Sequence, residues 1–173
     1  MEITILIFLF GGLFLGWSLG ANDAANVFGT AVGTRMVSFT SAAIICSVFV
    51  ILGAIISGAG TTETLGKLGA INALPGAFAA CVAAGISVYL MTKVGLPVST
   101  TQAIVGAIVG WNLYTGSSTN LQVLITILGT WILCPIIAGV IAMGLFTFTK
   151  RVILNRKLHI LRLDAYTRTA LLL

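Results

Sequence analysis

The chain has 173 residues, of which 58% are hydrophobic and only 8% are charged, and its mean hydropathy is +1.13. The formal net charge of +5 comes mainly from the C-terminal end. Such a composition excludes a water-soluble globular domain. Long uncharged runs exceed the roughly 20 residues that a membrane-spanning helix needs: Met36–Thr62, Leu68–Thr92 and Val94–Thr149. The sequence therefore predicts an all-α integral membrane protein, a polytopic helical bundle.

The first apolar segment, Ile3–Leu19, follows Glu2 without the basic residues that open a secretory signal peptide, so we expect a retained first helix. The next stretch, Gly20–Arg35, reads GANDAANVFGTAVGTR and places polar residues and glycines where a membrane helix would ordinarily continue. Glycine lets the backbone leave helical geometry, and unwound backbone is tolerated at membrane depth where it lines a wet cavity. We expect the helix to break in this stretch.

Asp23 is the only acid within the segments predicted at membrane depth. An ionised carboxylate near the bilayer centre costs on the order of 3 kcal/mol, so it normally faces a partner, a cavity or an ion. With Asn22, Asn26 and unwound backbone carbonyls, Asp23 is predicted to form an oxygen-rich cation site suited to Na⁺. The alternative is that the first helix ends at Gly20 and that Asn22 or Asp23 caps a following helix at the membrane surface.

Apolar segments predict further helices at Val37–Gly58, at a pair formed by Leu74–Met91 and Val98–Asn112, and at Leu121–Thr149, which contains Pro135. The pair is either two full spans or a re-entrant hairpin whose tip, KVGLPVSTTQ, stops inside the bilayer. Glycines at helical spacing predict close packing between helices: Gly12, Gly16 and Gly20, then Gly29 and Gly33, and Gly106 and Gly110.

Hydroxyl and amide side chains cluster where the second member of that pair begins: Ser99, Thr100, Thr101 and Gln102. Ser99 and Gln102 have the spacing of a capping box, and Gly95 with Pro97 marks a break just before it. A helix that begins there inside the membrane would direct free N–H groups and its positive dipole end at the break, which favours an anion. The alternative is an ordinary capped helix start near the surface.

The segment after the last apolar run contains one acid, Asp164, and six basic residues: Lys150, Arg151, Arg156, Lys157, Arg162 and Arg168. Because Lys and Arg are enriched on the cytoplasmic side, we expect this end inside the cell and the N-terminus outside. Residues 1–149 are predicted to form the transmembrane domain, and residues 150–173 a basic cytoplasmic segment leading into a further helix. The loop Thr61–Ile71 is expected outside.

No pattern of an enzyme competes with these motifs. His159 is the only histidine, and the three cysteines lie apart within apolar segments, which indicates packing rather than a disulfide framework or metal site: Cys46, Cys81 and Cys134. A nucleotide-type phosphate loop is also lacking from the sequence. A cation held beside an anion would couple the binding of the two solutes electrostatically, which is the logic of a symporter.

GANDAANVFGTAVGTR (residues 20–35) and GLPVSTTQAIVG (residues 95–106) resemble the signatures of the inorganic phosphate transporter (PiT) family, and the resemblance extends over essentially the whole chain. It implies a secondary carrier in the cell membrane for inorganic phosphate, driven by Na⁺ or H⁺ and built from two inverted repeats with broken-helix hairpins. By position it implies cation binding by Asn22, Asp23 and Asn26, and phosphate binding by Ser99, Thr100, Thr101 and Gln102.

Two features depart from the family pattern. Many relatives resemble STTH where this chain has Gln102, and a glutamine does not titrate near neutral pH, which favours Na⁺ over H⁺ coupling. The chain also carries one signature where the family has two, so we interpret it as an N-terminal half whose partner is a second inverted repeat.

The expected ligands are therefore inorganic phosphate and Na⁺ as coupling ion, with membrane lipid around the helices, no other cofactor and no nucleic acid. The sequence leaves open a passive anion channel, a proton-coupled phosphate carrier, a non-transporting scaffold whose basic tail binds lipid, and assembly into a homo-oligomer.

Overall fold

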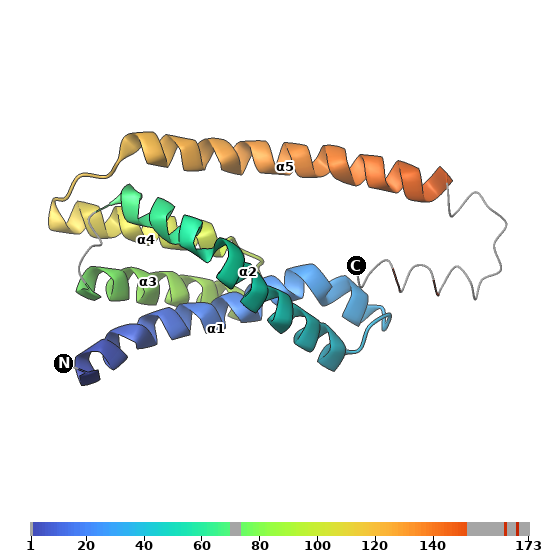
Figure 1. Cartoon of the computed structure of the whole chain (residues 1–173), viewed down its shortest axis with the longest axis horizontal. Helices are drawn as coiled ribbons and strands as arrows, with labels where there is room; N and C mark the ends of the chain where they lie inside the picture. The colour runs from blue at the N-terminus through green and yellow to red at the C-terminus, as the bar shows by residue number, and fades with distance from the viewer. Residues whose placement is uncertain (1, 70–73, 152–164, 166–168, 170–173) are drawn as a thin grey trace. The chain divides into compact units, whose positions relative to one another are not determined.

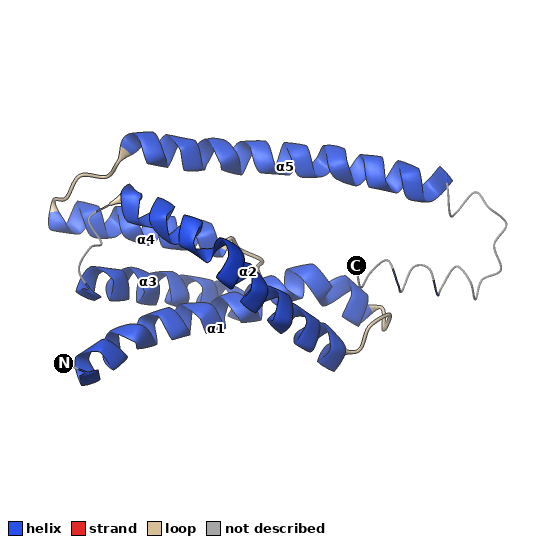
Figure 2. Ribbon diagram, viewed as in Figure 1, coloured by secondary structure: helices blue, strands red, loops and turns tan. Residues whose placement is uncertain are grey.

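The computed structural model describes residues 2–69, 74–151, 165 and 169, and every regular element in these ranges is a helix (Figures 1 and 2). Five helices are described in chain order: α1 (Glu2–Gly33), α2 (Phe39–Leu68), α3 (Leu74–Lys93), α4 (Thr100–Thr115) and α5 (Leu121–Thr149). The chain divides into two compact units, residues 1–124 and 125–173.

Four of the described helices, α1, α2, α3 and α5, are long and apolar enough to cross a membrane. The 16 residues of α4 fall short of the roughly 20 that a span requires. The predicted class of a polytopic all-α membrane protein is confirmed.

Within the first unit, α3 packs against both α1 and α4 (Figure 1). The rings of Phe8 and Phe78 meet edge to face with centroids 5.7 Å apart, and farther along both helices Trp17 lies 5.7 Å from Tyr89. The residue numbers of these contacts rise together along the two helices, so α1 and α3 run parallel. The buried apolar side chains of α3 and α4 form the rest of this core: Ala80, Ala84, Val88, Val105 and Ile108.

The prediction of a break after Gly20 is wrong, because α1 is one continuous helix from Glu2 to Gly33. Asn22 and Asp23 find partners on other elements through their side chains, so they do not need to interrupt the helical hydrogen bonds of the backbone. At membrane depth this satisfies every peptide group, and a helical glycine costs only about 1 kcal/mol relative to alanine. Neither the unwound backbone nor a cap at Asn22 or Asp23 is therefore present.

The glycines that pack α1 against α3 are not those that their spacing suggested. A Cβ built on Gly11 would lie 2.8 Å from the Phe78 ring, and one on Gly85 would lie 2.7 Å from the Phe14 ring. All seven glycines of the predicted packing stripes have no atom within 4 Å of a built Cβ. The contact face of α1 carries Gly11, and the stripe that begins at Gly12 lies on the neighbouring face.

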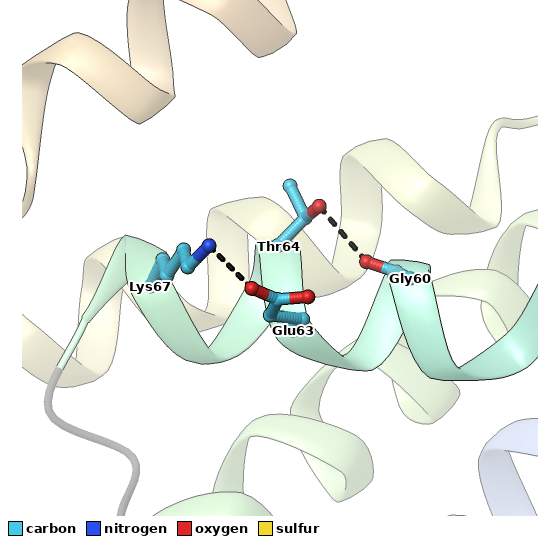
Figure 3. A network of polar contacts seen from close by, with 4 residues as sticks. All are labelled: Gly60, Glu63, Thr64 and Lys67. Carbon is cyan, nitrogen blue, oxygen red and sulfur yellow. Dashed lines mark hydrogen bonds and ion pairs between the residues drawn. The ribbon is translucent and has the colours of Figure 1, made fainter.

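α2 extends beyond its predicted end at Gly58, so the expected loop from Thr61 is helical as far as Leu68. Hydroxyls in this last part donate to carbonyls one turn back, as Thr64 does to Gly60 at 2.9 Å. An ion pair between Glu63 and Lys67 also lies along the helix axis (Figure 3). These local bonds let the polar sequence continue the helix. Leu68 is fully buried, and its carbonyl accepts the N–H of Asn120 at 3.0 Å.

The predicted bounds of α5, Leu121–Thr149, are those observed, and Pro135 lies inside the helix. Asn120 caps its first turn by accepting the N–H groups of Gln122 and Val123 at 3.1 and 3.2 Å. None of the residues of α5 is buried. Most of the predicted basic segment, residues 150–173, lies outside the described part of the chain.

Candidate functional site

The turn between α3 and α4 is built by the sequence that predicted a break there. α3 ends at Lys93, and Gly95 takes a positive φ of 77°, a conformation that glycine adopts without strain. Ser99 is the N-cap of α4, and its Oγ accepts the N–H of Gln102 at 3.3 Å. We call residues 94–99 the hairpin tip. The predicted helix start at this position is confirmed.

Asn22 of α1 fastens the hairpin tip. Its Nδ2 donates to Thr92 Oγ1 at 2.8 Å and to the carbonyl of Leu96 at 3.4 Å. Its Oδ1 accepts the backbone N–H of Val98 at 3.3 Å and Nδ2 of Asn26 at 3.5 Å. Asn22 is only 5% exposed, so these bonds satisfy an amide that water does not reach.

Asp23 lies next to Asn22 and reaches the first turn of α4. Its Oδ2 accepts a hydrogen bond of 3.1 Å from Oγ1 of Thr100. Thr100 is buried and Asp23 is half-buried. No other described group donates to this carboxylate, so its Oδ1 remains available for a ligand. The structure thus joins one member of the predicted cation group directly to one member of the predicted anion group.

The remaining predicted residues lie around this contact. Ser99 and Gln102 line a depression of about 360 Å³ between α3 and α4, together with Ser87, Met91 and Pro97. Asp23 is not part of that lining. Thr101 and Asn26 are exposed, and Asn26 meets the group only through Asn22. The predicted residues are therefore neighbours, but they do not all surround one cavity.

Thr92 belongs to the site and was missed by the sequence analysis. Its hydroxyl donates to the carbonyl of Val88 at 2.8 Å and accepts the amide of Asn22. A lone threonine near the end of an apolar run carries no functional pattern. Only the parallel packing of α3 on α1, which a single sequence does not specify, places it opposite Asn22.

The site offers two kinds of group to ligands. The Asp23 carboxylate, whose Oδ1 is left open, suits a hard cation such as Na⁺. At the start of α4 the N–H of Gln102 is capped by Ser99 Oγ, whereas the N–H groups of Thr100 and Thr101 lack partners within their own helix and belong to the same turn as the hydroxyls of Ser99 and Thr101. These are donors that an oxyanion requires.

Comparison with known proteins agrees with this chemistry. The model of the Phosphate transporter family matches residues 19–170. A protein of Pyrococcus furiosus named as a candidate phosphate permease is 37% identical over 166 residues, which cover 90% of this chain and 39% of the relative. A Plasmodium falciparum protein named as a sodium-dependent phosphate transporter is 32% identical over 83% of this chain and 23% of its own length.

A solved structure described as the sodium-dependent phosphate transporter superposes with a TM-score of 0.78 at 29% identity, covering 91% of this chain and 41% of that one. The chain thus spans about two fifths or less of the length of these relatives. Its helices and the match over residues 19–170 agree in indicating a multi-pass membrane protein. The chain therefore belongs to the phosphate transporter family, which is a family of transporters and not of enzymes.

Proposed function

We propose that this chain is the N-terminal half of a symporter that carries inorganic phosphate together with Na⁺. Residues 1–149 are its membrane domain and first inverted repeat, and the basic residues from 150 onward face the cytoplasm. Asn22, Asp23 and Asn26 bind Na⁺, and Ser99, Thr100, Thr101 and Gln102 bind phosphate. A second inverted repeat completes the site.

The observation that carries the proposal is the hydrogen bond between Thr100 and Asp23. It joins a helix start that offers anion donors to the one acid predicted at membrane depth. A carboxylate next to an anion site repels phosphate unless a cation neutralises it, so bound Na⁺ would raise the affinity for phosphate. By linkage, phosphate raises the affinity for Na⁺ by the same factor.

Na⁺ is favoured over H⁺ as the coupling ion by two features. Gln102 does not titrate near neutral pH, and Asp23 directly follows Asn22, which accepts a hydrogen bond from Asn26, so two further amide side chains lie within one turn of the carboxylate along α1. Relatives described as sodium-dependent phosphate transporters support the same choice.

The proposal is tested by uptake of radiolabelled phosphate into proteoliposomes that contain the complete protein, with and without an inward Na⁺ gradient. We expect the inward Na⁺ gradient to stimulate phosphate uptake. Asp23→Asn should reduce this stimulation at least tenfold, because the amide carries no charge to hold the cation. Glu63→Gln is the matched control, since it neutralises an exposed acid of α2 and should preserve stimulation.

Stimulation in Asp23→Asn equal to that of the wild type would refute the role of this carboxylate. Uptake that proceeds equally with and without the Na⁺ gradient would refute Na⁺ coupling and indicate a passive channel. Stimulation by a proton gradient instead would indicate a proton-coupled carrier.

A further inference from the structure

We propose that Thr92 is a positioning residue: it orients the Asn22 amide so that Asn22 latches the hairpin tip to α1, which holds Thr100 against Asp23. Here the latch means the bonds of Asn22 to Thr92, to the Leu96 carbonyl and to the Val98 N–H. Its consequences for transport depend on the proposed function, whereas the latch itself does not.

The orientation of the Asn22 amide follows from the chemistry of its partners. The hydroxyl hydrogen of Thr92 is used by the carbonyl of Val88, so its oxygen is left to accept, and only the Nδ2 end of Asn22 donates. On the opposite side of the amide, the Val98 N–H is only a donor and therefore requires Oδ1. The two requirements agree: Nδ2 faces Thr92 of α3, and Oδ1 faces the N–H of Val98 in the hairpin tip.

This arrangement uses the whole hydrogen-bonding capacity of Asn22. Its two N–H groups donate to Thr92 and Leu96, and its Oδ1 accepts from Val98 and Asn26. Two of these partners, Leu96 and Val98, are backbone groups of the hairpin tip. Because the tip has no regular secondary structure, these bonds give its backbone groups the hydrogen-bond partners that a helix would otherwise provide.

The latch also sets the geometry of the neighbouring contact. Val98 is held by Asn22, and Thr100, two residues later, donates to Asp23, the residue after Asn22. Two adjacent residues of α1 thus bind both sides of the Ser99 cap. Any shift of the tip along α1 strains the Thr100–Asp23 bond, so the orientation of Asn22 controls whether the two proposed ligand groups meet.

A cation that binds Oδ1 of Asn22 must break one of the hydrogen bonds that this oxygen already accepts. Because Oδ1 already accepts two N–H groups, a cation that takes this oxygen must displace Val98 or Asn26. The latch and the cation therefore compete for one oxygen, and Thr92 determines how strongly the latch holds.

The test compares Thr92→Val, which removes the hydroxyl but keeps the shape, with Thr92→Ser, which restores the hydroxyl. Thr64→Val is the matched control, since Thr64 makes the same bond to a carbonyl one turn back but no interhelical bond among the described residues (Figure 3). Hydrogen exchange of the peptide that covers residues 94–99 is measured by mass spectrometry on the complete protein in detergent or nanodiscs.

We expect Thr92→Val to speed exchange in this peptide by roughly 3- to 10-fold, the effect of losing about one net hydrogen bond. Thr92→Ser and Thr64→Val should exchange like the wild type. In phosphate uptake, Thr92→Val should raise KM several-fold while the maximal rate per folded protein changes little, because the tip is displaced and not removed.

Unchanged exchange at residues 94–99 in Thr92→Val would overturn the latch. The same conclusion would follow if Thr64→Val or Thr92→Ser sped exchange equally, since that indicates general loosening. Because exchange needs no transport, loss of Na⁺-driven uptake in the wild type would defeat the proposed function and leave this readout intact.

Discussion

Of the four buried polar residues in the described part of the chain, only Ser18 makes no side-chain hydrogen bond, although Oδ1 of Asn112 also lacks a partner. The Ser18 side chain is 1% exposed, and its Oγ has no hydrogen-bond partner. Other hydroxyls on the described helices donate to a carbonyl one turn back, as Ser47 does to Ala43 at 2.8 Å. A buried hydroxyl without a partner lowers stability, because its bonds to water are lost and not replaced.

Ser18→Ala is therefore expected to raise the free energy of unfolding by roughly 1 kcal/mol. Ser47→Ala is the control, since Ser47 is exposed and its bond is local, and it should change stability by less than about 0.5 kcal/mol. Reversible unfolding in mixed detergent micelles measures both. Destabilisation by Ser18→Ala of more than about 1 kcal/mol would mean that the hydroxyl has a partner in the membrane.

At the scale of single residues, the sequence identified candidate site residues but did not indicate how they pair. Asp23 and the run from Ser99 to Gln102 stand out because charged and hydrogen-bonding groups are rare in apolar segments. The bond between Asp23 and Thr100 depends on where the hairpin tip lies along α1, and a single sequence does not contain that register. Thr92 was missed for the same reason.

At the scale of elements, close approach of α1 and α3 is decided by two glycines. Gly11 lies under Phe78, and Gly85 lies under Phe14, so each helix offers a glycine to an aromatic ring of the other. This contact keeps α1 and α3 near enough for Asn22 to reach Thr92. The packing of the bundle and the geometry of the site are therefore linked through the same pair of helices.

Gly85→Ala tests this link. The added Cβ would lie 2.7 Å from Cδ1 of Phe14 and 3.4 Å from Cα of Leu15. The Phe14 ring must therefore move, and the nearby backbone of α1 leaves little room for the Cβ itself to shift. We expect a loss of about 1–3 kcal/mol in unfolding free energy. Gly106→Ala is the control, because no atom lies within 4 Å of its Cβ, and it should be neutral or slightly stabilising. Equal stability of the two variants would contradict the close contact.

The helix bounds were predictable where hydrophobicity changes sharply and unpredictable where polar residues continue a helix. α5 was predicted to the residue because Asn120 precedes an uncharged, mostly apolar run that ends just before Lys150. The first helix was predicted to break within Gly20–Arg35, yet Asn22 and Asp23 of α1 are bonded by α3, α4 and the hairpin tip. α2 was predicted too short because local bonds such as Glu63–Lys67 extend it.

At the scale of the whole molecule, the first unit limits how the chain crosses the bilayer. α1 and α3 run parallel, and the hairpin tip meets α1 at Asn22, eleven residues before α1 ends at Gly33. At 1.5 Å per residue, α1 continues about 16 Å beyond the tip. Together with the short α4, this geometry favours the re-entrant hairpin over two full spans. Both alternatives leave α5 running inward if the basic residues are cytoplasmic.

Single cysteines test this topology in a background where the three native cysteines are replaced by alanine. Thr40→Cys marks the first turn of α2, Ser118→Cys marks the loop after α4, and Leu96→Cys marks the hairpin tip; all three positions are exposed. A membrane-impermeant maleimide added to intact cells should label Ser118→Cys and spare Thr40→Cys, because the turn after α1 is predicted to be cytoplasmic.

After permeabilisation, Thr40→Cys should react quickly and Leu96→Cys at least several-fold more slowly, since a recessed tip is reached only through a narrow wet path. Equal rates at these two positions would show that the tip lies at the membrane surface, as two full spans require. Labelling of Thr40→Cys from outside would invert the orientation deduced from the basic residues. The two outcomes are independent, because the depth of the tip is set by its attachment to Asn22, whereas the orientation is set by charge.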